Sequence, residues 1–127
     1  MPPKTILLVD DDTQHLKLHA LVLKKAGYRP ITTVVGSLSF GVHEHENPAL
    51  IFLDYRLNST LSARQVAGLL KERFPQSPLI VLSGLDTLPA DMKGVADDFL
   101  QKGEPQDLVA LADRMLKTDG NTSRAGD

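Results

Sequence analysis

The sequence predicts an α/β fold in which one doubly wound sheet of five parallel strands carries helices on both faces. Short apolar runs alternate with helical patterns five times over about 115 residues, which is the rhythm of an open parallel sheet. The strongest runs are apolar at every position, as expected for strands that helices cover on both sides. Because crossovers between parallel strands are right-handed, the helices are expected on both faces of the sheet.

Five segments are predicted to be the strands. Three are continuous apolar runs, each followed by polar residues, and they span residues 5–9, 49–53 and 78–82. Two weaker candidates span residues 29–35 and 98–100.

The first predicted helix spans residues 13–26, and Gly27 is a plausible stop. Its apolar side chains form one broad arc: Leu16, Leu18, Ala20, Val22, Leu23 and Ala26. His15 and His19 lie four residues apart, a spacing that can bind a metal ion on a helix. Because both fall within the apolar arc, we interpret them as histidines on the core side of the helix.

Two further helices have clear start signals. Residues 62–74 open with Ser62 and Gln65 at the spacing of a capping box. Residues 104–117 carry Pro105 at the first helical position, where proline is favoured.

The remaining segments have weaker patterns. Residues 37–46 and 86–95 are also expected to be helical, although glycine or proline interrupts both. Residues 118–127 contain a single apolar side chain, that of Ala125. The sequence therefore predicts one domain over residues 1–117, followed by a flexible tail.

Length and composition exclude several classes of protein. The chain has 127 residues, of which 42% are hydrophobic and 24% are charged, an ordinary mixture for one globular domain. Fourteen basic and 16 acidic residues give a net charge of −2, which disfavours nucleic-acid binding. The absence of cysteine rules out disulfides, thiol catalysis and thiolate zinc sites. The N-terminal apolar run is too short for a signal peptide or a membrane span, so we expect a cytoplasmic protein without a membrane partner.

Polar side chains follow the predicted strands at their carboxyl ends, where function concentrates in parallel sheets. They are Asp10, Asp11, Asp12, Asp54, Ser83 and Lys102. Crowded carboxylates repel one another, and Mg²⁺ would relieve that repulsion. An anion such as a phosphoryl group could then approach, with Lys102 and the Ser83 hydroxyl binding its oxygens.

Four segments together resemble the receiver domain of two-component response regulators. They occur in the family's order and are residues 6–12 (ILLVDDD), 50–57 (LIFLDYRL), 80–84 (IVLSG) and 98–102 (DFLQK). The resemblance covers residue 4 to about residue 117. It implies a flavodoxin-like sheet with the strand order 2-1-3-4-5.

The resemblance implies a role for each acidic residue of the site. Asp54 would be the phosphoacceptor, which takes a phosphoryl group from a phosphohistidine on a histidine kinase or phosphotransfer protein. Asp10 and Asp11 would bind Mg²⁺ together with Asp54 and the backbone carbonyl of Arg56. The protein would act as a phosphoacceptor and not as a turnover enzyme.

The resemblance also implies how phosphorylation is sensed. Ser83 would hydrogen-bond the phosphoryl group, and Lys102 would pair with it. Ser83 and Phe99 would form the switch that reports phosphorylation to the face of the fourth helix, fifth strand and fifth helix. The output would then pass to an unknown downstream protein, with a homodimer as another possibility.

Some positions depart from the family's pattern. Asn58 stands where proline is usual, and Gly103 follows the lysine where proline is usual. Neither Ser62 nor Ala63 supplies the glycine that usually follows the phosphoacceptor loop. These changes fall in the loops after Asp54 and Lys102 and leave every phosphorylation residue in place.

Two other functions stay open at this point. A degenerate receiver would bind partners without being phosphorylated. A phosphatase of the haloacid dehalogenase type would use Asp10 as its nucleophile, but Gln14 stands where its loop usually has threonine or valine. Asp54 discriminates among the three functions, because only the phosphorylatable receiver needs it.

Overall fold

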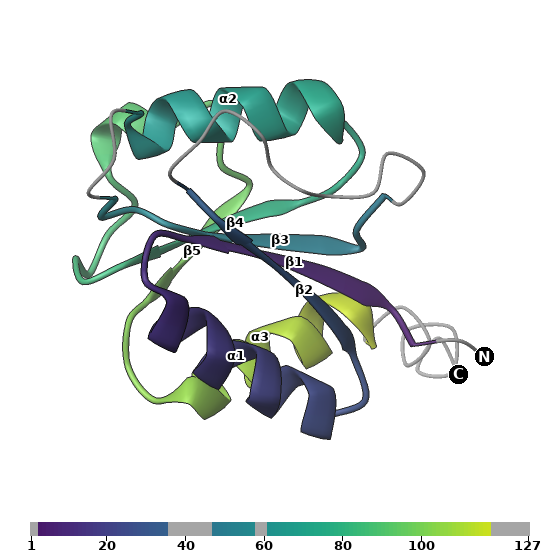
Figure 1. Ribbon diagram of the computed structural model, residues 1–127. Coiled ribbons are helices and arrows are strands. Elements are labelled where there is room, and N and C mark those ends of the chain that lie inside the picture. The colour runs from purple at the N-terminus through teal and green to yellow at the C-terminus, as the bar shows by residue number, and fades with distance from the viewer. Residues whose placement is uncertain (1–2, 36–46, 58–60, 118–127) are drawn as a thin grey trace, which may run out of the picture.

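Five parallel strands form one sheet in the order β2-β1-β3-β4-β5, which confirms the predicted fold class and strand order. The computed structural model describes residues 3–35, 47–57 and 61–117 (Figure 1). The strands are β1 (Thr5–Asp10), β2 (Arg29–Val34), β3 (Leu50–Asp54), β4 (Leu79–Ser83) and β5 (Asp98–Gln101). Each strand starts and ends within one residue of the segment predicted for it.

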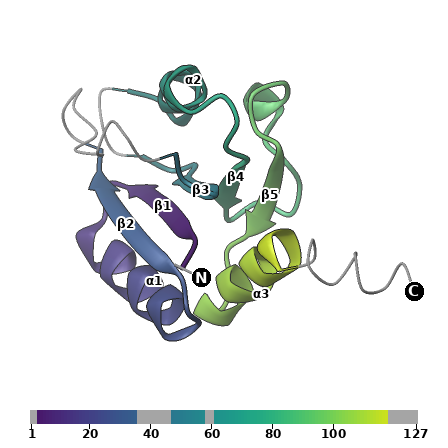
Figure 2. The ribbon, with the colours of Figure 1, turned by 90° about the vertical axis from the view of Figure 1, so that its right-hand side faces the viewer.

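Helices cover both faces of the sheet. They are α1 (Thr13–Lys25), α2 (Ala63–Arg73), the short 3₁₀ helix η1 (Ala90–Met92) and α3 (Pro105–Leu116). Figures 1 and 2 show α1 and α3 side by side on one face and α2 on the opposite face. The right-handed crossovers expected of parallel strands produce this arrangement.

The alternation of side chains along β1 shows how the sheet supports two cores. Ile6 and Leu8 belong to the core beneath α1 and α3, where they share a cluster with Leu16 of α1. Leu7 and Val9 point the other way and belong to the core beneath α2. Since all four side chains are buried, the strand must be apolar at every position, as its sequence is.

The helix boundaries follow their capping residues. The Asp12 carboxylate accepts hydrogen bonds from the first turn of α1, and Gly27 follows that helix with a φ of 99°, a conformation that favours glycine. Pro105 opens α3, as predicted.

Replacing Ser62 by alanine is expected to lower the free energy of unfolding by about 1 kcal/mol. The Ser62 hydroxyl accepts the Gln65 backbone N–H at 3.1 Å, and the Gln65 side chain accepts the Ser62 backbone N–H at 2.8 Å, which completes the predicted capping box. Urea unfolding measures the loss. Ser62→Thr keeps a hydroxyl and is the control; equal stability of the two variants would contradict the capping role.

The prediction of a helix over residues 86–95 is wrong. Only Ala90–Met92 is helical there, as one 3₁₀ turn. Pro89 precedes this turn with extended backbone, and Gly94 follows it with a φ of 87°, so too few residues lie between them for an α-helix. The predicted helix over residues 37–46, Asn58 and the predicted tail over residues 118–127 lie outside the described residues.

The apolar arc predicted for α1 is too broad. Only Leu16 and Leu23 of that helix are buried, whereas Leu18 is 45% exposed. The side chain of His15 is exposed as well, so its interpretation as a core-side histidine is wrong. His19 is half-buried, and this burial lowers its pKa.

No helix within the described ranges is both long enough and apolar enough to cross a membrane. The longest, α1, has 13 residues, whereas a membrane-spanning helix needs about 20.

Candidate functional site

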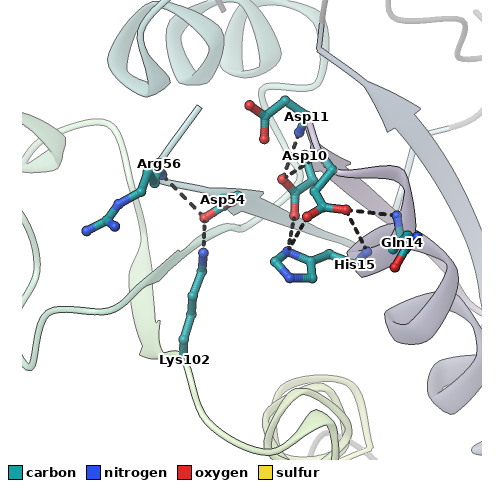
Figure 3. Close-up of polar contacts among 8 residues, drawn as sticks. Asp10, Asp11, Gln14, His15, Asp54, Arg56 and Lys102 are labelled. Atoms are coloured by element: carbon teal, nitrogen blue, oxygen red, sulfur yellow. Dashed lines mark hydrogen bonds and ion pairs between the residues drawn. The ribbon is translucent and has the colours of Figure 1, made fainter. Parts of the chain in front are cut away.

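Four of the predicted site residues lie at one edge of the sheet because parallel strands end there together. Asp10 ends β1, Asp54 ends β3 and Ser83 ends β4, while Lys102 directly follows β5. The register places β3 between β1 and β4, so Asp54 is central among them. Figure 3 shows the carboxylates of β1 and β3 and the lysine side chain converging at this edge.

Asp54 is a buried carboxylate whose charge is balanced by one lysine. Its exposed fraction is 3%, and the Lys102 Nζ lies 2.7 Å from its Oδ1 (Figure 3). The Arg56 backbone N–H donates to the same oxygen at 3.3 Å. Both contacts hold the Oδ1 of the buried carboxylate in place at the edge of the sheet.

Asp10 is a second buried carboxylate, 4% exposed. Its Oδ1 accepts the backbone N–H groups of Asp11 at 2.7 Å and Asp12 at 3.2 Å. The pKa of Asp10 is raised to about 7; burial is the largest cause, and repulsion from Asp54 is the next. Two adjacent buried carboxylates against one lysine leave the site short of positive charge.

Asp11 and Asp12 have different environments from Asp10. Figure 3 shows the Asp11 carboxylate on the opposite side of Asp10 from His15. The Asp12 Oδ1 accepts the backbone N–H groups of Gln14 at 2.9 Å and His15 at 3.3 Å, so Asp12 is the N-cap of α1. The hydrogen bond from the His15 N–H is the main cause of the lowered pKa of Asp12.

His15 lies at the site, although its place in the helical pattern predicts a position on the core side. Its Nδ1 lies 3.7 Å from the Asp10 Oδ2 and 3.6 Å from the Asp12 Oδ2. Asp10, His15 and Asp54 each offer one ligand atom, and these atoms lie within 4.8 Å of one another. One feature of the sequence could have indicated that His15 lies near Asp10. Asp10 ends a predicted strand, the next helix starts three residues later, and His15 stands in its first turn.

Asp54, Ser83, Leu85 and Lys102 are among the residues that line a cleft of about 460 Å³. The Ser83 hydroxyl is buried and accepts the Leu85 backbone N–H at 3.0 Å. Phe99, the predicted switch residue, is half-buried and packs against the core beneath α2. The cleft gives an incoming group access to Asp54 from the side of β4 and β5.

The donor set of the site fits a hard divalent cation. Carboxylate oxygens are the ligands that Mg²⁺ prefers, and here two carboxylates are buried together; among the described residues, Lys102 supplies the one ammonium group paired with them. Burial and then repulsion from Asp54 raise the pKa of Asp10, so a cation beside it would favour its ionised form. A cation at Asp10 and Asp54 would remove the repulsion between them.

Curated relatives match most of this chain, although no protein-family model matches the sequence. The chain is 32% identical over 118 residues to the nitrogen assimilation regulatory protein NtrX of Azorhizobium caulinodans, covering 89% of this chain and 26% of that protein. It is 29% identical over 116 residues to the photosynthetic apparatus regulatory protein RegA of Rhodobacter capsulatus, covering 89% of this chain and 61% of that protein. The chain therefore spans less than two thirds of the length of these relatives.

Solved structures share the fold. NtrX from Brucella abortus superposes with a TM-score of 0.78 at 25% identity, covering 98% of this chain and 29% of that one. The Thermotoga maritima response regulator TrrA, in complex with Mg²⁺-BeF, superposes with a TM-score of 0.74 at 23% identity, covering 89% of this chain and 99% of that one. The chain is thus a homologue of the response regulators of two-component signalling, and its described part is folded as their receiver domain.

Proposed function

We propose that this domain is a phosphorylatable receiver in which Asp54 accepts a phosphoryl group. The donor would be a phosphohistidine on a histidine kinase or phosphotransfer protein. The single observation that carries the proposal is the buried Asp54 carboxylate at the strand edge, held 2.7 Å from Lys102 and next to the second buried carboxylate of Asp10. Asp10, Asp11, Asp54 and the Arg56 backbone carbonyl would hold Mg²⁺.

The proposed step is a phosphoryl transfer between two side chains. An Asp54 carboxylate oxygen forms a P–O bond as the P–N bond to the donor histidine breaks, and the imidazole leaves with the bonding electron pair. Lys102, which already lies at the carboxylate, would bind the oxygens of the transferred group. Bound Mg²⁺ would supply the positive charge that lets an anionic phosphoryl group approach two carboxylates.

The signal would leave the site through β4 and β5. The Ser83 hydroxyl lines the same cleft as Asp54, and its hydrogen bond from Leu85 would be exchanged for one to the phosphoryl group. Phe99 pairs with Val81 across the two strands and is half-buried, so a change at Ser83 would be transmitted to its packing. We propose that a downstream protein, or a second copy of this chain, binds the surface beside Phe99 of β5 in the cytoplasm; the predicted fourth helix of this surface is reduced to the 3₁₀ turn η1.

The test is incubation with Mg²⁺ and acetyl phosphate, followed by intact-mass measurement. Wild type is expected to gain the mass of one phosphoryl group, and Asp54→Ala is expected to gain none. Asp86→Ala, which removes an exposed aspartate from the loop after β4, is the matched control and should be modified like wild type.

Other outcomes would contradict the proposal in distinguishable ways. A wild type that stays unmodified with both acetyl phosphate and a phosphorylated histidine kinase would favour a degenerate receiver that binds partners without phosphorylation. Modification that persists in Asp54→Ala but is lost in Asp10→Ala would favour a phosphatase of the haloacid dehalogenase type with Asp10 as nucleophile.

A further inference from the structure

We propose that His15 is a third metal-binding side chain of this site and gives it a preference for borderline transition-metal ions, such as Co²⁺ or Zn²⁺, over Mg²⁺. The proposal rests on the metal site of the proposed function and adds a nitrogen ligand to its oxygen ligands. His15 stands outside the four segments that carry the resemblance to receiver domains.

The position of the imidazole is the first argument. The His15 Nδ1 is 3.7 Å from the Asp10 Oδ2, which is too long for a hydrogen bond. Two ligands that each lie about 2.0 to 2.2 Å from one metal ion are separated by roughly such a distance. The ligand atoms of Asp10, His15 and Asp54 all lie within 4.8 Å of one another, so a small movement of these side chains would bring all three to one ion.

The two carboxylates supply the second argument. Asp10 and Asp54 are each more than nine-tenths buried, and both face the same space at the sheet edge. The Lys102 Nζ lies 2.7 Å from the Asp54 Oδ1, whereas His15 lies on the side of Asp10 (Figure 3). A cation bound between the carboxylates would therefore lie beside the imidazole, with the ammonium group on the other side of Asp54.

The rigid attachment of His15 is the third argument. Its backbone N–H donates to the Asp12 Oδ1 at 3.3 Å, so the N-cap of α1 fixes the start of the helix relative to Asp10. The Asp12 Oδ2 lies 3.6 Å from the His15 Nδ1 and would favour the imidazole orientation that keeps it near the carboxylates. The histidine is thus held close to the site without being buried.

Ligand chemistry explains the expected selectivity. Mg²⁺ prefers oxygen ligands and retains water, so it gains little from an imidazole. Co²⁺ and Zn²⁺ bind imidazole nitrogen well, and their affinity rises when one is available. His15 should therefore change the ratio of the two affinities and leave Mg²⁺ binding nearly unaltered.

The experiment titrates the full chain with Co²⁺ and, separately, with Mg²⁺ by calorimetry at about pH 8, where an ordinary histidine is neutral. The variants are His15→Gln and His19→Gln. His19 is the matched control, because it lies one turn further along α1, with its ring centroid 6.2 Å from that of His15, outside the three-residue group. The visible spectrum of bound Co²⁺ gives a second readout of nitrogen ligation.

Wild type and His19→Gln are expected to bind Co²⁺ more tightly than Mg²⁺. His15→Gln is expected to lose at least roughly tenfold in Co²⁺ affinity, the smallest loss usual when a group that supports a metal site is removed. Its Mg²⁺ affinity should stay within about twofold of wild type, and the Co²⁺ spectrum should change.

Three results would overturn the inference. They are an unchanged Co²⁺ affinity in His15→Gln, an equal loss for both ions, and no binding of Co²⁺ to wild type. If Asp54 is still phosphorylated with Mg²⁺ in those cases, the proposed function stands and only the role of His15 fails. If wild type binds neither ion, the Mg²⁺ dependence of the proposed function fails as well.

Discussion

Asp10→Asn is expected to stabilise the fold at about pH 8 by roughly 2 to 4 kcal/mol, in the absence of divalent cations. The pKa of Asp10 rises from its ordinary value of 3.8 to about 7 on folding, because the carboxylate is buried beside Asp54. The asparagine carries no charge, and its side-chain oxygen can still accept the N–H groups of Asp11 and Asp12. The substitution therefore removes the buried charge and its repulsion from Asp54, and it keeps the local hydrogen bonds.

The sign of the pH dependence follows from the raised pKa. The folded state binds the Asp10 proton more tightly than the unfolded state does. The stability that this proton contributes is fully present below pH 3.8 and is lost as the pH rises through about 7. The stability difference between Asp10→Asn and wild type should therefore grow from about pH 5 to about pH 8. Urea unfolding at both pH values measures it.

Asp11→Asn is the matched control, since it removes the same charge one residue away from a less buried position. It should change stability far less than Asp10→Asn does. Adding Mg²⁺ at about pH 8 should raise the stability of wild type and leave Asp10→Asn nearly unchanged, because binding to the folded state alone stabilises it. A stability difference that is independent of pH would contradict the electrostatic explanation.

Lys102→Gln is expected to have the opposite effect and to lower the free energy of unfolding by about 2 to 3 kcal/mol. It removes the ammonium group that lies 2.7 Å from the buried Asp54 carboxylate. Breaking a buried ion pair leaves an uncompensated charge inside the protein. We expect a smaller loss of stability than is usual for a buried ion pair, because the Lys102 side chain is 36% exposed and solvent screens part of the interaction.

A double-mutant cycle separates charge from packing in this prediction. Asp54→Asn combined with Lys102→Gln leaves neither charge and should recover most of the stability lost in Lys102→Gln. Lys93→Gln removes an exposed lysine beside η1 and is the matched control. Additive effects of the two site substitutions would show that the lysine does not compensate Asp54.

The predictions for Asp10→Asn and Lys102→Gln both follow from the excess of negative charge at the site. Removing a carboxylate should stabilise the fold, and removing the ammonium group should destabilise it, because the folded domain confines more negative than positive charge at this edge. The proposed binding of a cation would relieve this excess of negative charge, and the two apolar cores stabilise the fold in its absence.

The sequence determined the sheet and the strand ends. A run such as residues 5–9 is apolar at every position, and only a strand covered on both faces buries all of its side chains. The capping box at Ser62 and the proline at position 105 located two helix starts, because these signals act within one turn of the helix. The residues at the strand ends then identified the candidate site.

The tertiary structure decided which of those residues meet. Asp10 faces Asp54 because β1 pairs with β3, whereas Asp11, its neighbour in sequence, lies on the other side of Asp10 from His15. His15 joins the carboxylates because of how α1 packs on the sheet, and a helical pattern that treats Leu16 and Leu18 as one face cannot reveal this. Side-chain periodicity fixes which residues share a face of an element, but only the packing of elements against one another fixes which faces are buried and which side chains reach the site.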